Sequence, residues 1–302
     1  MLYSLGVAPA RWSQWRLGVH VVVAGCGWLG LAIGRELLNQ GHRVTAVRRD
    51  PARAAELAAA GLEPLVLDLT EPNAHRQLPA DVQALVGCQS ARSDSAEGYR
   101  AAYLGVNRTL LRAAEELQVQ ALVYTGSTGV FGYSDGREVQ EDAAVDPRSP
   151  TAEVLVEAEQ LLVEAGQRGL PTRVVRLSGL YGPGRWGTQQ RVRSGALALG
   201  PGDDAFMNFC HLDDAVAAVL GALRSGRDGA IYHASDAAPP RRSEVVQWMA
   251  ARLGIQARVS AQPAAVGAAN RRIRAEWSRQ QLGLTLVHPD FRSGFSLAPT
   301  VS

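Results

Sequence analysis

The sequence contains no lysine, and all 31 of its basic residues are arginine. Schiff-base chemistry, and any mechanism that needs a lysine ammonium group, is therefore excluded. Long apolar runs are also missing, because no stretch approaches the roughly 20 residues that a membrane span requires. Residues 1–18 include Arg11 and Arg16 but no apolar segment typical of a signal peptide, so we interpret them as an N-terminal extension outside the fold.

Cysteine and net charge are scarce as well. The three cysteines, Cys26, Cys88 and Cys210, are scattered and odd in number. This pattern argues against disulfides and a structural zinc site and for a reducing compartment, so we expect a cytoplasmic protein. The net charge is only +2, which gives no electrostatic case for nucleic acid or a membrane as a partner. No spacing of His, Cys, Asp and Glu suggests a metal site.

The most informative segment is a glycine-rich turn between a β-branched run and a helix-like stretch. A strand from residue 19 leads into Gly25, Cys26, Gly27, Trp28, Leu29 and Gly30, and a helix is expected over 31–39. This is the order of a dinucleotide-binding βαβ unit. Gly25 permits the tight turn, Gly27 lets the backbone approach a pyrophosphate, and Gly30 lets the helix pack on the strand. The alternative is a turn that serves packing alone.

The rest of the chain alternates between strands and helices up to about residue 178. Strands are expected at 43–47, 65–67, 82–86, 121–124 and 172–177, and helices at 51–60, 97–117 and 151–168. Such alternation is typical of a doubly wound parallel sheet. Short helices follow at 188–199, 213–224, 243–253 and 274–282. We expect an α/β protein with a Rossmann-type domain over 19–178 and a small substrate cap over 179–302, from which elements can return to the sheet.

The end of the second strand indicates which nucleotide is bound. It reads Val47-Arg48-Arg49-Asp50. An acidic residue at this point binds the ribose hydroxyls of NAD, whereas arginine suits the 2′-phosphate of NADP. A guanidinium can hold a phosphate through two parallel hydrogen bonds, so Arg48 and Arg49 favour NADP over NAD. The alternative is that both arginines are solvated and Asp50 only caps the next helix.

Several further segments resemble, in order, those of the extended short-chain dehydrogenases/reductases, also called NAD-dependent epimerases/dehydratases. Besides the loop they are Asp68-Leu69-Thr70, Tyr103 with Asn107, and the segments 124–132, 176–184, 209–214 and 288–294. The resemblance spans residues 19–296. It implies that Asp68 and Leu69 lie near the adenine, and it suggests a homodimer formed through the helices at 97–117 and 151–168.

The usual catalytic pair of that family, Tyr-x-x-x-Lys, is missing. In the family the tyrosine exchanges a proton with the substrate and the lysine lowers its pKa. Alignment on Glu157-Ala158-Glu159 puts Thr151 at the position of the tyrosine and Leu155 at that of the lysine. The alcohol of threonine titrates far above any useful range, and leucine carries no charge. The chain therefore resembles an atypical branch of the family.

The remaining candidates for chemistry follow the later strands. Ser127 holds the place of the family's catalytic serine and would bind a substrate oxygen, with Thr128 as second choice; the alternative is a turn residue. Tyr181 is a candidate proton donor, although the turn that follows it directs it toward the nicotinamide end. Gly182 and Arg185 are expected to contact the substrate, the alternative for Arg185 being solvated surface. His211 and Asp213-Asp214 are interpreted as a helix N-cap.

Two functions fit these features. The first is an NADP-dependent oxidoreductase or epimerase that acts on a small polar substrate such as a sugar nucleotide. In it Ser127 orients the substrate, and the proton comes from Tyr181, water or the substrate. The second is a non-catalytic NADP-binding sensor or scaffold. The absent tyrosine and lysine favour the second function, and the intact serine loop and the cap favour the first.

Overall fold

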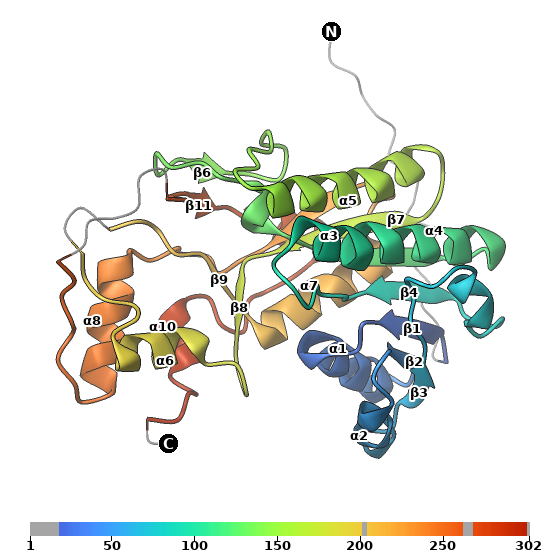
Figure 1. Ribbon diagram of the computed structural model, residues 1–302, viewed down its shortest axis with the longest axis horizontal. Coiled ribbons are helices and arrows are strands. Elements are labelled where there is room, and N and C mark those ends of the chain that lie inside the picture. The colour runs from blue at the N-terminus through green and yellow to red at the C-terminus, as the bar shows by residue number, and fades with distance from the viewer. Residues whose placement is uncertain (1–17, 201–203, 262–267, 301–302) are drawn as a thin grey trace, which may run out of the picture.

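The computed structural model describes residues 18–200, 204–261 and 268–300 (Figure 1). Its centre is a seven-stranded parallel sheet in the order β10-β7-β5-β4-β1-β2-β3. The strands are β1 (His20–Ala24), β2 (Arg43–Arg48), β3 (Glu63–Val66), β4 (Ala84–Gly87), β5 (Ala121–Ser127), β7 (Thr172–Leu177) and β10 (Ile231–Ala234). The middle valines of β1 are fully buried because helices cover both faces of the sheet. The expected Rossmann-type α/β fold is confirmed.

Two layers of helices cover the sheet. Helices α1 (Trp28–Asn39) and α7 (Leu212–Ser225) contact each other on one face, and α4 (Val106–Glu116) and α5 (Pro150–Gln167) contact each other on the other face (Figure 1). Helix α2 (Ala54–Ala59) packs on β3. Short turns of helix lie at η1 (Pro51–Arg53), η2 (Ala74–Gln77) and η4 (Thr128–Val130). Among the described residues no helix is long and apolar enough to cross a membrane.

The helix expected over 97–117 is not regular. It consists of α3 (Ala96–Tyr99), a π-helical segment η3 (Arg100–Gly105) and α4. The i→i+5 bonds of a π-helical turn admit an extra residue without breaking the helix, and such turns often lie at functional sites. Tyr103 is inside this segment.

The cap occupies the left of Figure 1. Its elements are β6 (Glu138–Val139), β8 (Gly179–Tyr181), α6 (Gly187–Ser194), β9 (Phe209–His211), α8 (Arg242–Arg252), β11 (Arg272–Ile273) and α10 (Phe291–Phe295). Helix α9 (Glu276–Leu282) packs instead on α7 and β10. Its core contains the rings of Tyr181, Phe209, Phe291 and Phe295. Between β9 and α8 the chain returns to the sheet as α7 and β10. The cap is therefore assembled from separate segments of the chain.

Candidate functional site

The glycine-rich loop is held against the ends of two strands. The backbone N–H groups of Gly25 and Cys26 both donate to the carbonyl oxygen of Val47, at 3.2 and 3.1 Å. Gly25 has a φ of +81°, and a Cβ atom there would lie 2.7 Å from the Cα of Gln89. Only glycine fits this position, because the left-handed backbone and the close approach of β4 both exclude a side chain.

Helix α1 begins directly after the loop. The backbone N–H groups of its first turn, from Trp28, Leu29 and Gly30, have no partner within the helix and carry the positive end of its dipole. A Cβ on Gly30 would lie 3.0 Å from the Gly25 carbonyl oxygen, so the helix packs tightly on the strand. A Cβ on Gly27 would meet only ordinary contacts, which leaves the loop open to a ligand. These residues fit the pyrophosphate of a dinucleotide.

Cys26 fills space within this loop. Its side chain is 1% exposed, and burial raises the pKa of its thiol to about 12. The sulfur is therefore protonated at neutral pH and adds no negative charge beside a phosphate.

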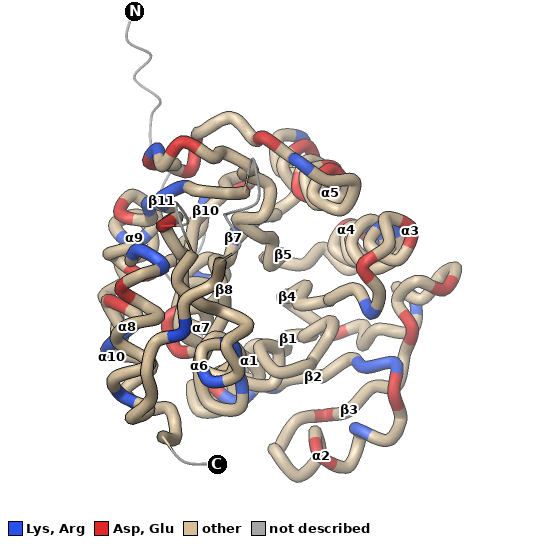
Figure 2. The backbone as a smooth tube through the Cα atoms, turned by 60° about the vertical axis from the view of Figure 1, so that its left-hand side comes forward, with Lys and Arg blue, Asp and Glu red and all other residues tan. Residues whose placement is uncertain are grey.

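One end of the site is a first cavity, which is lined by Arg48, Arg49 and Asp68. It lies at the carboxyl end of β2, where the chain carries basic residues (Figure 2). Arg48 Nη1 donates to the carbonyl oxygen of Cys26 at 2.9 Å, and Arg49 Nη1 donates to Asp68 Oδ2 at 3.5 Å. Asp50 Oδ1 accepts from the Ala52 N–H at 3.0 Å and caps η1. Partial burial would raise the pKa of Asp68, but hydrogen bonds from Thr70 and the charge of Arg49 hold it below its usual value. Asp68 is therefore ionised at neutral pH.

The other end is a second cavity of about 1170 Å³ that opens to solvent. It shares Gly25, Gly27, Gln89 and Ser90 with the first cavity, so the two are joined along the glycine loop. Its far wall includes Thr125, Ser127 and Thr128 from the end of β5, Leu177 to Leu180, Leu155 from α5, Tyr103 from η3 and Arg185 from the cap. The site thus runs from β2, past the loop, to the contact between sheet and cap.

Ser127 and Thr128 both line this cavity, but their hydrogen bonds differ. Ser127 Oγ accepts from the Gly129 N–H at 3.0 Å, so its own hydroxyl proton is free to be donated. Thr128 is 5% exposed, and its Oγ1 donates to the Leu177 carbonyl oxygen at 3.4 Å. Ser127 is therefore the better placed of the two to bind a substrate oxygen.

The two positions that lack the catalytic pair are placed differently. Leu155 lines the cavity, whereas Thr151 is not among its lining residues. The Thr151 hydroxyl lies 3.1 Å from that of Ser149, the N-cap of α5. The apolar Leu155 side chain cannot lower the pKa of any neighbouring hydroxyl, so a proton must come from another group.

Tyr103 is the hydroxyl-bearing ring that our choice of catalytic candidates missed. It lines the cavity from η3. Burial raises its pKa, although the Ala91 N–H opposes this shift. The resemblance had already placed Tyr103 four residues before Asn107, whose Oδ1 accepts from Gln89 Nε2 at 2.7 Å in the wall of the same cavity. That spacing was the available signal.

The structure corrects the expectations for Tyr181 and Gly182. Tyr181 is 2% exposed, stacks on Phe295 with ring centroids 4.2 Å apart, and donates to the Asp290 carbonyl oxygen at 3.4 Å. A Cβ on Gly182 would lie 3.2 Å from His211 Nε2. Both residues are packed inside the cap and do not line the cavity, because β8 turns inward toward the cap's aromatic core.

Arg185 does line the cavity and is linked to the loop through Trp28. Its guanidinium carbon lies 5.4 Å from the centroid of the Trp28 ring. Trp28 Nε1 donates to the Pro183 carbonyl oxygen at 2.8 Å. Trp28 thus joins the phosphate loop to the turn of the cap that carries Arg185.

Among the described residues, one group of possible metal ligands is an exception to the expected absence of a metal site. His211, Asp213 and His288 offer ligand atoms that all lie within 4.8 Å of one another. His211 also caps α7, as predicted, since its Nδ1 accepts from the Asp213 N–H at 3.3 Å. Sequence spacing did not indicate the group, because His288 follows Asp213 by 75 positions.

Comparisons with known proteins identify the family. The model of the NAD dependent epimerase/dehydratase family matches residues 21–235. Protein YeeZ of Escherichia coli K12 is 29% identical over 244 residues, covering 78% of this chain and 84% of its own. A 3-diazoavenalumate denitrifying reductase of a Streptomyces species is 30% identical over 250 residues, covering 76% and 79%.

Solved structures show the same fold. The UDP-glucuronic acid 4-epimerase of Bacillus cereus, in complex with UDP-glucuronic acid and NAD, superposes with a TM-score of 0.77. It is 16% identical, and the match covers 92% of this chain and 97% of that one. The family match includes the glycine loop, the serine loop and the return of the chain to β10. The chain therefore belongs to the NAD-dependent epimerase/dehydratase family.

Proposed function

We propose that this protein is an NADP-dependent reductase that delivers hydride to the carbonyl carbon of a small polar substrate. Membership of the family supports a nicotinamide cofactor. The observation that carries the proposal is the continuity of the two cavities, which share the glycine loop between Arg49 at one end and Ser127 at the other. A ligand on the loop reaches both ends.

The preference for NADP rests on the residues at the end of β2. Arg49 is 40% exposed in its side chain, and its contact with Asp68 is long, so its guanidinium is free to turn toward a 2′-phosphate. Arg48 has one N–H bonded to the loop and further N–H groups that can be donated. Asp50 uses one carboxylate oxygen, Oδ1, as the cap of η1, which leaves it less available to ribose hydroxyls than an uncapped acidic residue would be.

The direction of reaction follows from the hydroxyl groups of the cavity. When bound, the nicotinamide would supply hydride. Ser127 would donate a hydrogen bond to the substrate oxygen and polarise its carbonyl group. Tyr103 is protonated at neutral pH and can donate a hydrogen bond to the same oxygen, although burial raises its pKa and thereby makes it a weaker acid. Two protonated hydroxyl groups match a carbonyl oxygen, which only accepts hydrogen bonds, and this match supports reduction as the proposed direction.

The substrate is proposed to be anionic. Arg185 lines the cavity, is exposed and stacks over Trp28, which places a cation where the cap meets the loop. A phosphate or carboxylate group would pair with it. A sugar nucleotide satisfies this requirement, and the structurally similar epimerase described above binds one.

The test measures binding first and turnover second. Titration of the protein with NADPH and with NADH, followed by nicotinamide fluorescence, should show tighter binding of NADPH. Oxidation of bound NADPH is then followed with a panel of carbonyl compounds and nucleotide sugars. Ser127→Ala and Tyr103→Phe should each lower turnover by about 10²–10⁴-fold without weakening NADPH binding.

The matched control is Tyr133→Phe. The Tyr133 hydroxyl donates to the Ala144 carbonyl oxygen, and this residue does not line the cavity. Its removal should leave turnover unchanged. Equal effects of Tyr103→Phe and Tyr133→Phe would refute the role of Tyr103, and equal affinity for NADH and NADPH would refute the choice of NADP.

A second candidate function is a non-catalytic NADP-binding sensor or scaffold. It is favoured by one observation, the apolar Leu155 in the wall of the cavity where the family has its lysine. Tight NADPH binding with no oxidation across the whole panel would support it.

A homodimer formed through α4 and α5, which lie side by side on the sheet, is also proposed and is tested by light scattering (Figure 1).

A further inference from the structure

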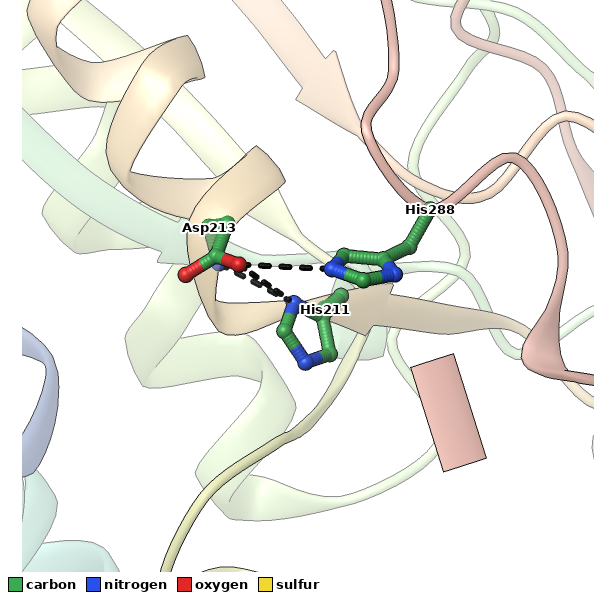
Figure 3. Close-up of side chains that lie close together, drawn as sticks. All are labelled: His211, Asp213 and His288. Atoms are coloured by element: carbon green, nitrogen blue, oxygen red, sulfur yellow. Dashed lines mark hydrogen bonds and ion pairs between the residues drawn. The ribbon is translucent and has the colours of Figure 1, made fainter. Parts of the chain in front are cut away.

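Three metal-ligating side chains converge in the cap, at the carboxyl end of β9 (Figure 3). His211 is the last residue of β9, Asp213 is in the first turn of α7, and His288 precedes α10. Asp213 Oδ2 lies 3.4 Å from His211 Nδ1 and 3.3 Å from His288 Nε2. Both imidazole rings therefore point a nitrogen at the same carboxylate oxygen.

The protonation of His211 makes this arrangement unusual. Its Nδ1 accepts the Asp213 backbone N–H, so this nitrogen carries a lone pair and no proton. An ionised carboxylate oxygen beside it is also an acceptor only. The two imidazole rings lie with centroids 3.8 Å apart. His288 Nε2 can carry a proton and donate it to Asp213 Oδ2, and a bound cation would replace that proton together with the long bond of 3.3 Å from the Asp213 N–H to His211 Nδ1.

The distances suit a particular class of cation. Two ligands of a tetrahedral Zn²⁺ ion, each about 2.0–2.1 Å from the metal, are about 3.3–3.4 Å apart. The separations of 3.3 and 3.4 Å around Asp213 Oδ2 match this value, and the two imidazole nitrogens, which lie within 4.8 Å of each other, would draw closer around an ion. Two imidazole nitrogens and one carboxylate oxygen are a ligand set that zinc commonly takes, with water in the fourth position.

Neighbouring residues fix the positions of the three ligands, and one side of the cluster is open to solvent. Asp214 binds the segment that carries His288, because its carboxylate accepts from the N–H groups of Val287 at 2.7 Å and His288 at 3.0 Å. His211 is completely buried in β9. The side chain of Asp213 is 57% exposed, so an ion and a water ligand can reach the site from solvent.

We propose that His211, Asp213 and His288 form a binding site for one divalent transition-metal ion of the zinc class. The three residues do not line the nucleotide cavity, so the site is separate from the proposed reductase centre. A bound ion would join the start of α7, which packs on the sheet, to the segment that leads into α10 of the cap. Its expected role is to fix the cap on the sheet.

The test uses the full chain and the metal alone. After removal of metal with a chelator, the protein is titrated with Zn²⁺ by calorimetry and the bound metal is counted by elemental analysis. One ion per chain is expected, together with a rise in the midpoint of thermal unfolding as zinc is added. Co²⁺ should bind in the same place and give visible absorption bands of a tetrahedral site.

Two variants remove a ligand in different ways, and a third is the control. Asp213→Asn keeps the shape of the side chain, and His288→Tyr keeps a ring. Each should weaken Zn²⁺ binding by more than about 100-fold, beyond the 10–100-fold that follows loss of an outer partner. Asp142→Asn removes an exposed carboxylate outside the cluster and should change nothing.

The results that would overturn the metal-site proposal are distinct from those that support it. A folded Asp213→Asn or His288→Tyr protein that binds Zn²⁺ as tightly as the unaltered chain would overturn the proposal. Absence of stoichiometric binding to the unaltered chain, or weak binding that all variants share, would also overturn it. Because the readout is bound metal and not turnover, a failed search for reductase activity leaves the result unaffected.

Discussion

Replacement of Arg176 by methionine should destabilise the protein strongly. Arg176 pairs with Glu159 through two bonds of 2.9 Å, and the side chains are only 4% and 3% exposed. Removal of one partner of a buried ion pair leaves an uncompensated charge and costs about 3–5 kcal/mol. With a urea dependence of about 3 kcal/mol/M, the unfolding midpoint should fall by about 1–2 M.

Three further measurements decide whether the unpaired charge is the cause. The double variant Arg176→Met with Glu159→Met should recover most of the loss, because an apolar pair can replace a buried ion pair. Burial raises the pKa of Glu159, against the opposing charge of Arg176. Its protonation at low pH should therefore shrink the deficit of the single variant. Arg148→Met breaks an exposed pair with Asp146 and should cost less than about 1 kcal/mol. A deficit for Arg176→Met that is no larger, or one that the double variant does not reduce, would refute the reasoning.

Three other predictions concern the loop, the nucleotide and pH. Gly27→Ala should leave the urea midpoint of unfolding unchanged but weaken NADPH binding by more than about tenfold. Gly25→Ala should lower the urea midpoint, because a Cβ atom at Gly25 has no space. Equal urea midpoints for the two variants would contradict this prediction. Arg49→Ala should weaken NADPH binding by about tenfold or more and leave NADH binding unchanged, as fluorescence titration can show; a parallel loss for both nucleotides would count against it. Burial lowers the pKa of His233 to about 3, so the unfolded chain takes up a proton that the folded chain refuses between about pH 6.5 and 3. Stability should therefore fall as the pH falls, with His233 contributing about 2 kcal/mol between pH 7 and 5, and His233→Asn should flatten that dependence in urea unfolding at the two pH values.

The sequence was most informative where local pattern and tertiary role coincide. The strand predicted over 172–177 has those bounds in the structure, and the loop between β1 and α1 has the geometry that its three glycines indicated. The apolar period of 97–117 identified a helix but could not indicate the π-helical turn at Arg100–Gly105. That segment packs on α5, a contact between distant parts of the chain, and it carries Tyr103 in the cavity wall.

The sequence-based predictions failed where contacts with segments distant in the chain determine the position of a side chain. Tyr181 was predicted beside the nicotinamide because a Gly-Pro-Gly turn follows it, yet α10, which lies more than 100 residues later, provides Phe295 as its stacking partner. Arg48 was predicted to bind phosphate or to be solvated, and neither alternative included its bond to the loop carbonyl of Cys26. His288 meets Asp213 across 75 positions. No short-range pattern carries such contacts.

The return of the chain to the sheet limits how this protein can be re-engineered. Truncation after residue 178 would strip β10 from the edge of the sheet and α7 from its face. The exposed backbone of β7 would then be open to pairing with other chains, so the truncated product should aggregate. A graft that exchanges substrate specificity with a relative must therefore use separate inserts within 179–208 and 236–300, keep β9, α7 and β10 in place, and preserve the pairing of β11 with β6. Loss or gain of a cap in this architecture requires coordinated changes at several points of the gene, which favours gradual remodelling of existing segments.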